Sequence, residues 1–203
     1  MSRRRRGKLP QEPVEVRIDD LSHDGRGVAT HEDKKLFVHG ALPGERVLAR
    51  ITGRRRNLDE GETVEVLEAS PHRIEPRCPH FGQCGGCSLQ HLDPEQQIQA
   101  KQNTLAQNLQ RIGKIEPETF WEPLTGALWA YRRKARLSVR YVHKKERVLV
   151  GFRERYGRFV ADMQECHVLD QRIAQQLPRL AELIMSMDAK RTIPQIEVAC
   201  GDT

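Results

Sequence analysis

The chain has 203 residues, of which 31% are charged and 37% hydrophobic, and its formal net charge at pH 7 is +6. No apolar run approaches the length needed to cross a bilayer, and the basic start lacks the apolar stretch of a secretory signal, so we expect a cytoplasmic protein with no membrane segment. A basic balance favours polyanions such as nucleic acid, although charge alone fits a solubilising surface equally well.

The first part of the chain is typical of a small barrel. Residues 1–10 predict a flexible basic arm, and residues 14–18, 46–51 and 63–67 alternate between apolar and polar as half-buried strands do. Shorter apolar runs at 28–29 and 35–38 lie between turns rich in Gly and Asp. Five short strands at this spacing predict an oligonucleotide-binding type of barrel over residues 11–69.

Basic residues occur in blocks, which a uniform solubilising surface does not require. One block is Arg3 to Arg6, and the others lie next to predicted strands, as expected for a surface that follows phosphates. The candidate RNA contacts are Arg54, Arg55, Arg56, Arg132, Arg133, Lys134 and Arg136.

A helix is predicted after a proline-containing linker and a cysteine loop. Asp93 can cap it, Pro94 suits its first position, and Gly113 is the predicted C-terminal cap. Its apolar residues recur on one face, which should pack against a neighbour. These residues are Ile98, Leu105, Leu109 and Ile112.

The last third returns to strands. Residues 136–152 predict a hairpin, and a second helix should begin after Asp170, with Pro178 kinking it or delaying its start. Residues 196–200 read as a strand for which the sequence offers no following neighbour, so we expect the chain to stop inside a domain. The predicted fold class is α+β, mostly β, with a barrel followed by a partial second domain.

Three of the five cysteines lie in one short loop, Cys78-Pro-His-Phe-Gly-Gln-Cys84-Gly-Gly-Cys87. Thiolates suit zinc or iron–sulfur clusters, and both commonly take four ligands. Zinc sites more often use two close pairs, whereas three close cysteines and a distant one are typical of a cluster.

The fourth ligand is less certain from residues alone. Cys166 lies in a polar stretch before a helix, whereas Cys200 lies in an apolar strand, where a free cysteine is usually a core residue. His80, His91 and His167 could each replace one thiol, although we favour hydrogen-bonding or surface roles for them. Four flanking arginines could offset cluster charge or contact RNA; they are Arg73, Arg77, Arg153 and Arg155.

The loop from Cys78 to Leu92 resembles the cluster-binding loop of the RNA uracil-C5 methyltransferases. Residues 131–136 and 151–155 resemble the central domain of that family, and residues 165–169 resemble the segment with its fourth cluster ligand. The barrel resembles the TRAM domain that opens those enzymes. The resemblance covers essentially the whole chain.

The resemblance implies a [4Fe-4S] cluster held by Cys78, Cys84, Cys87 and Cys166, and 23S ribosomal RNA as partner. It also implies an S-adenosylmethionine-dependent parent enzyme whose donor-binding domain and nucleophilic cysteine are missing here, so no catalytic or S-adenosylmethionine-binding residue is assigned. The implied domains are a TRAM barrel at 11–69, a truncated central iron–sulfur domain at 70–91 and 123–203, and a helical segment at 92–122 belonging to the absent catalytic domain.

We expect a monomer that is inactive by itself. Two other hypotheses stay open from the sequence: a stand-alone RNA-binding module with a metal centre, and a zinc protein that acts at the ribosome.

Overall fold

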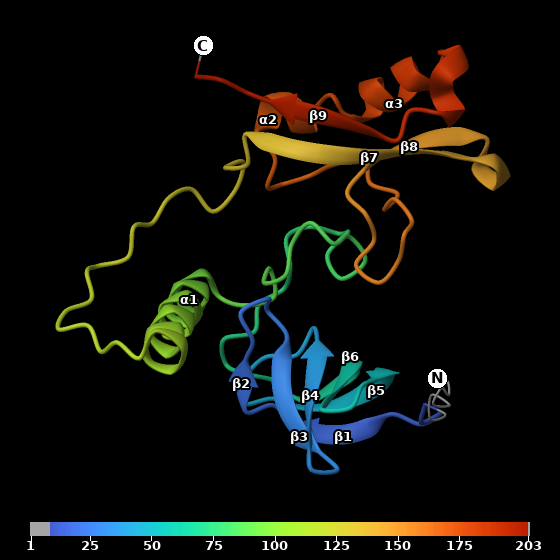
Figure 1. Ribbon diagram of the computed structural model, residues 1–203. Helices are drawn as coiled ribbons and strands as arrows, with labels where there is room; N and C mark the ends of the chain where they lie inside the picture. Colours follow the sequence, from blue (N-terminus) through green and yellow to red (C-terminus); the bar gives the residue numbers. More distant parts are fainter. Residues whose placement is uncertain (1–8, 203) are drawn as a thin grey trace, which may run out of the picture. The chain divides into compact units, whose positions relative to one another are not determined.

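The computed structural model describes residues 9–202, so most of the predicted basic arm lies outside the described residues. The chain divides into two compact units (Figure 1). The first contains the chain up to Glu75 together with His91–Pro123, and the second contains Pro76–Gln90 and the chain from Leu124 onward. Among the described residues, no helix is long and apolar enough to span a membrane.

The first unit contains one six-stranded sheet in the order β1-β5-β6-β4-β3-β2. All neighbouring strands are antiparallel except β4 and β6, which run parallel. The strands are β1 (Val14–Arg17), β2 (Asp20–Leu21), β3 (Gly27–His31), β4 (Lys34–His39), β5 (Arg46–Arg54) and β6 (Leu58–Glu68).

The prediction of five strands was wrong by one. The two-residue β2 pairs with the start of β3, and this pairing is too short for alternation to reveal. The alternation is confirmed for residues 14–18 and 46–51, because Val16, Ile18, Val47, Ala49 and Ile51 are buried in one apolar cluster, but not for residues 63–67, where Val64 is exposed. β6 begins five residues before the predicted strand, since Gly61 pairs with Ile51 and leaves no side chain to signal alternation.

Helix α1 (Pro94–Asn108) follows, and the Asp93 carboxylate caps it by accepting from the Glu95 N–H at 2.9 Å. The predicted C-terminal cap at Gly113 was wrong. The helix continues as a π-turn, η1 (Leu109–Gly113), and Lys114 adopts the left-handed cap with φ 54°. No residue of α1 is buried, so its apolar face is not packed in the part of the chain that the structure describes.

The second unit contains a three-stranded antiparallel sheet in the order β8-β7-β9. Its hairpin consists of β7 (Lys134–Val142), the 3-10 turn η2 (His143–Lys145) and β8 (Arg147–Gly151). The last strand, β9 (Gln195–Ala199), pairs with β7 on the side away from the hairpin partner. The sequence offered this strand no following neighbour, and its partner in the structure precedes it in the chain.

The predicted second helix is broken into α2 (Gln171–Ala174) and α3 (Leu177–Met185), followed by the 3-10 turn η3 (Asp188–Arg191). Asp170 caps α2, and Pro178 lies in the first turn of α3, which confirms the later start. Leu137 and Val139 of β7 pack in one core with Ile173 and Ile184 of the helices, which lie on one face of the sheet (Figure 1).

Candidate functional site

The loop from Cys78 to Cys87 is folded by its own backbone. The Phe81 N–H donates to the Cys78 carbonyl at 3.0 Å, and the Cys84 N–H donates to the His80 carbonyl at 2.8 Å. Gly82 has φ 90°, a left-handed conformation that side chains rarely adopt. These contacts turn the chain tightly enough to bring Cys84 and Cys87 back toward Cys78.

Close packing fixes the second half of the loop. A Cβ on Gly86 would lie 2.9 Å from the Phe152 ring and 3.4 Å from the Cys84 sulfur. The adjacent Gly85 N–H donates to the Arg153 carbonyl at 2.8 Å. The loop therefore lies against the segment that follows β8, and only glycine fits at position 86 without a shift.

The structure brings together the four cysteines predicted as ligands. They line one small cavity, together with His80 and His167. Cys200 does not line it but packs beside the core of the second unit. Of the three histidines weighed as alternative ligands, His91 also lies elsewhere, buried in the first unit.

Burial raises the pKa of the Cys78, Cys84 and Cys166 thiols. Negative charge on the neighbouring cysteines raises it further, so the free thiols are held in the neutral form. Any metal that binds them would displace protons.

Backbone N–H groups oppose this effect at the same three sulfurs. The Gly86 N–H donates to the Cys84 sulfur at 3.4 Å. Hydrogen bonds from His80 to Cys78, and from Val168 and Leu169 to Cys166, likewise lower the thiol pKa. N–H groups directed at sulfur stabilise thiolates and tune iron–sulfur clusters, so the cavity has the chemistry of a soft-metal site.

The cavity is small, which limits what can bind in it. Its volume is about 10 Å³, roughly the space of one water molecule. Among residues 9–202, no three His, Cys, Asp or Glu side chains meet as a group that could hold a metal ion. The donor set therefore fits a cluster in kind and number, and the four cysteine side chains would have to rearrange to hold one.

Arginines hold the loop in place. Arg155 donates to the Cys87 carbonyl, and its guanidinium lies 5.8 Å from the Phe81 ring centre. Arg132 donates to the Gly86 carbonyl at 3.4 Å and lies 5.5 Å from the Phe152 ring centre. Arg132, predicted as an RNA contact, thus also supports the cysteine loop.

Arg73 has a different role, within the first unit. Its guanidinium donates to both carboxylate oxygens of the fully buried Glu45, at 2.5 and 2.7 Å, and to the Gly40 carbonyl at 2.6 Å. Through these contacts the Arg73 guanidinium takes part in the packing of the barrel. This ion pair could not be predicted from local pattern, because Glu45 and Arg73 are 28 residues apart.

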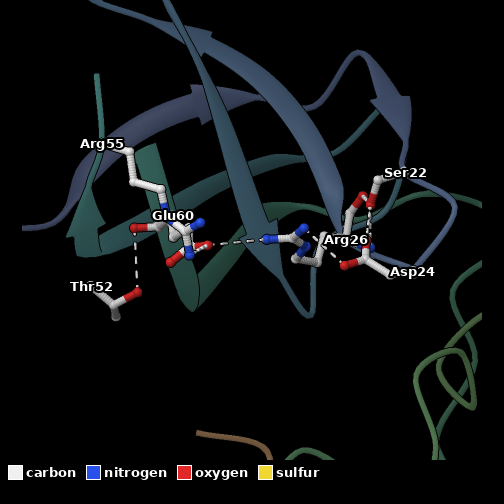
Figure 2. Close-up of polar contacts among 6 residues, drawn as sticks. All are labelled: Ser22, Asp24, Arg26, Thr52, Arg55 and Glu60. Carbon is white, nitrogen blue, oxygen red and sulfur yellow. Dashed lines mark hydrogen bonds and ion pairs between the residues drawn. The ribbon is translucent and has the colours of Figure 1, made fainter. Parts of the chain in front are cut away.

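Several predicted RNA contacts of the barrel are held by carboxylates. Arg55 pairs with Glu60 at 2.8 Å, and Arg26 approaches the same carboxylate at 3.7 Å (Figure 2). Arg54 pairs with Glu32 at 3.3 Å. Arg55 is exposed and Arg54 is partly exposed, so a phosphate could replace their carboxylate partners at small cost.

Some of the predicted RNA contacts at 132–136 are likewise paired with carboxylates. Arg136 pairs with Glu197 at 2.9 Å, and Arg133 pairs with Asp202. Arg56 and Lys134 are exposed, and neither forms an ion pair with any residue from 9 to 202.

Comparison with known proteins adds to this geometry. Residues 10–64 match the family model of the TRAM domain. The chain is 55% identical over 98% of its length to the 23S rRNA (uracil(1939)-C(5))-methyltransferase RlmD of Alkalilimnicola ehrlichii. It is 54% identical over 98% of its length to the RlmD protein of Xanthomonas campestris pv. campestris.

The chain is thus similar in sequence to curated RNA uracil-C5 methyltransferases. It spans about half the length of the curated relatives it matches, 45% and 46% in these two cases. Its fold also resembles the Pyrococcus abyssi tRNA (uracil-54, C5)-methyltransferase, solved in complex with S-adenosyl-L-homocysteine. The TM-score is 0.56 with 25% identity, and the match covers 84% of this chain and 36% of that one.

Proposed function

We propose that this chain is the part of an S-adenosylmethionine-dependent 23S rRNA (uracil-C5)-methyltransferase that binds ribosomal RNA and a [4Fe-4S] cluster. The observation that supports this most is the meeting of four cysteines from two distant segments at one cavity, in a chain 54–55% identical to RlmD proteins. The methyl donor would bind in a domain outside this chain, and we assign no catalytic residue here.

The proposed ligands are Cys78, Cys84, Cys87 and Cys166. Four thiols at one cavity match the four-cysteine ligation of a cubane cluster, and the N–H groups directed at three of the sulfurs suit the bound thiolates. When bound, the cluster would link the loop to the segment that precedes α2. Its role would be structural, because no redox step is part of methyl transfer from S-adenosylmethionine.

Serine substitutions test the ligand set. Replacing Cys78, Cys84, Cys87 or Cys166 individually should lower the iron and sulfide bound by anaerobically reconstituted protein to a small fraction of the wild-type value. Cys200→Ser is the matched control and should bind as the wild type does. Full cluster content in any of the four variants would remove that residue from the ligand set.

The proposed RNA contacts are the exposed arginines and lysine at 54–56 and 132–136. Most are already oriented by carboxylates, so binding would exchange a carboxylate for a phosphate. Arg56 and Lys134 have no carboxylate partner to give up, so we expect them to contribute most to the affinity for RNA.

Residues 92–122 are proposed to pack against the catalytic domain of the longer enzyme. Leu105 is 52% exposed, Ile112 is 80% exposed and Trp121 is 90% exposed, which is unusual for large apolar side chains in a finished fold. Amide hydrogen exchange tests this: α1 should exchange quickly in this chain and slowly in a protein that continues through the methyltransferase domain.

The chain alone should transfer no methyl group. With labelled S-adenosylmethionine and unmodified 23S rRNA, we expect no incorporation above a protein-free control. Turnover would contradict the assignment of catalysis to a separate domain.

A further inference from the structure

The sheet of the second unit has a notch along one edge of β7. Strand β9 begins at Gln195, opposite Ser138, so the rest of β7 has no β9 partner on that side. Within the described residues, the backbone contact on that side is from the Val139 N–H to the Pro194 carbonyl at 2.9 Å. Because successive N–H groups of a strand alternate in direction, the Tyr141 N–H also points into this notch.

The notch is a cavity of about 260 Å³. Its ionisable lining is basic or aromatic: Arg140, Tyr141 and His143 come from β7 and η2, and Arg191 comes from the end of η3. No acidic residue lines it. Arg140 and Tyr141 point to opposite faces of the strand, and both can reach the cavity because it lies at the sheet edge.

Ring contacts hold two of these side chains. The Arg191 guanidinium lies 5.3 Å from the centre of the Tyr141 ring, and the His143 ring meets that ring edge-on at 4.9 Å. Tyr141 therefore holds both basic groups at the cavity.

The arginines of the notch differ in pairing from those of the predicted basic blocks. Arg136, on the same strand, pairs with Glu197 at 2.9 Å. Neither Arg140 nor Arg191 forms an ion pair with a carboxylate of the described residues. Their charge is thus available to a ligand without displacing an internal partner.

We propose that this notch binds a phosphodiester of single-stranded RNA. The free Tyr141 N–H at this sheet edge can donate to an anion, and guanidinium groups match the geometry of phosphate oxygens. The cavity is large enough for a phosphate with its sugar. This inference rests on the proposed function, because the phosphate belongs to the RNA partner, and it adds a site that the basic blocks do not include.

The test compares Arg140→Gln and Arg191→Gln with the unchanged chain. Arg179→Gln is the matched control, since it removes the same charge from an exposed position on α3 that does not line the cavity. Affinity for a uridine-containing single-stranded oligoribonucleotide is measured over a range of salt concentrations. Each lost phosphate contact should reduce the salt slope by about 0.7, which is about fivefold weaker binding at 0.1 M salt.

Arg191→Lys separates charge from geometry, because it keeps the cation but loses the planar guanidinium, so it should bind RNA more tightly than Arg191→Gln and more weakly than the unchanged chain. Circular dichroism confirms that each variant is folded. An amide NMR titration with inorganic phosphate should move the Tyr141 and Thr192 signals in the unchanged chain.

The outcomes are distinguishable. If the unchanged chain binds RNA and both Gln variants bind as Arg179→Gln does, the notch proposal is wrong and the RNA-binding function stands. If the unchanged chain binds no RNA, both the notch proposal and the proposed RNA-binding function are wrong. Amide shifts in the notch with an acidic peptide but not with RNA or phosphate would also overturn the phosphodiester assignment.

Discussion

At the scale of single residues, Glu45 is a buried carboxylate of the barrel that needs hydrogen-bond donors to compensate its charge. Its carboxylate is fully buried and accepts from the Arg73 guanidinium and from the Leu42 and Ser70 N–H groups. Burial alone raises the pKa of Glu45, but these hydrogen bonds outweigh it and the net pKa is below the ordinary 4.5. The folded protein therefore favours the ionised form.

We predict that Glu45→Gln lowers the free energy of unfolding by about 2–3 kcal/mol at pH 7, because Arg73 is left without its counter-charge. Urea unfolding measures this. The contribution of Glu45 is fully present above its unfolded pKa, about 4.3, and is lost as pH falls through its lower folded pKa. The difference between variant and wild type should shrink in acid, whereas Glu15→Gln, at an exposed pair, should change little.

The cysteine loop depends on a residue that binds no metal. Gly86→Ala would place a Cβ 2.9 Å from the Phe152 ring and displace the loop beside Cys84. We predict reduced iron content and weaker cluster retention, measured by visible absorbance after anaerobic reconstitution. Gly126→Ala is the control, since a Cβ there meets nothing within 4 Å. Equal cluster content in the two variants would show that close packing at position 86 is unimportant.

The cysteines predicted as ligands line one cavity, whereas the pairing of the arginines was not predicted. Cys166 could be preferred to Cys200 because of their surroundings, and only Cys166 lines the cavity. Arg55 and Arg136 read as free basic groups, yet each is paired with a carboxylate on an adjacent strand. Such pairs depend on strand register, which alternation alone does not determine.

At the scale of secondary structure, α1 is stabilised differently from α3. Leu177 and Ile184 of α3 are buried in the core, whereas α1 buries no residue in the described chain. Short helices without tertiary packing are marginal in water, so α1 should depend strongly on its N-terminal cap.

We predict that Asp93→Ala weakens α1 by about 1 kcal/mol, because the Glu95 N–H loses its acceptor. Amide exchange should accelerate over residues 94–108 while the barrel strands remain protected. Gln99→Ala, at an exposed position in the middle of α1, should not weaken it. Faster exchange of the strands as well would mean that α1 and the barrel unfold together.

The alternation of apolar and polar residues predicted the longer strands, and Pro178 predicted the late start of helix α3. The errors lie where local pattern is weak. β2 has two residues, β6 contains Gly61, and the Lys114 cap is a left-handed lysine that no propensity favours. The partner of β9 could not be inferred from its neighbours in sequence, because it pairs with Lys134–Ser138, some 60 residues earlier.

At the scale of the whole chain, the two compact units have different proposed roles. The first contains the TRAM match, and the second contains the four cysteines and the edge notch. The central claim is that Cys78, Cys84, Cys87 and Cys166, which line one cavity, hold a four-iron cluster.

Iron and acid-labile sulfide measured per chain, on protein purified without oxygen, test this claim most directly. A brown protein with about four iron and about four sulfide per chain is the predicted result. A colourless protein with one zinc and no iron would contradict it.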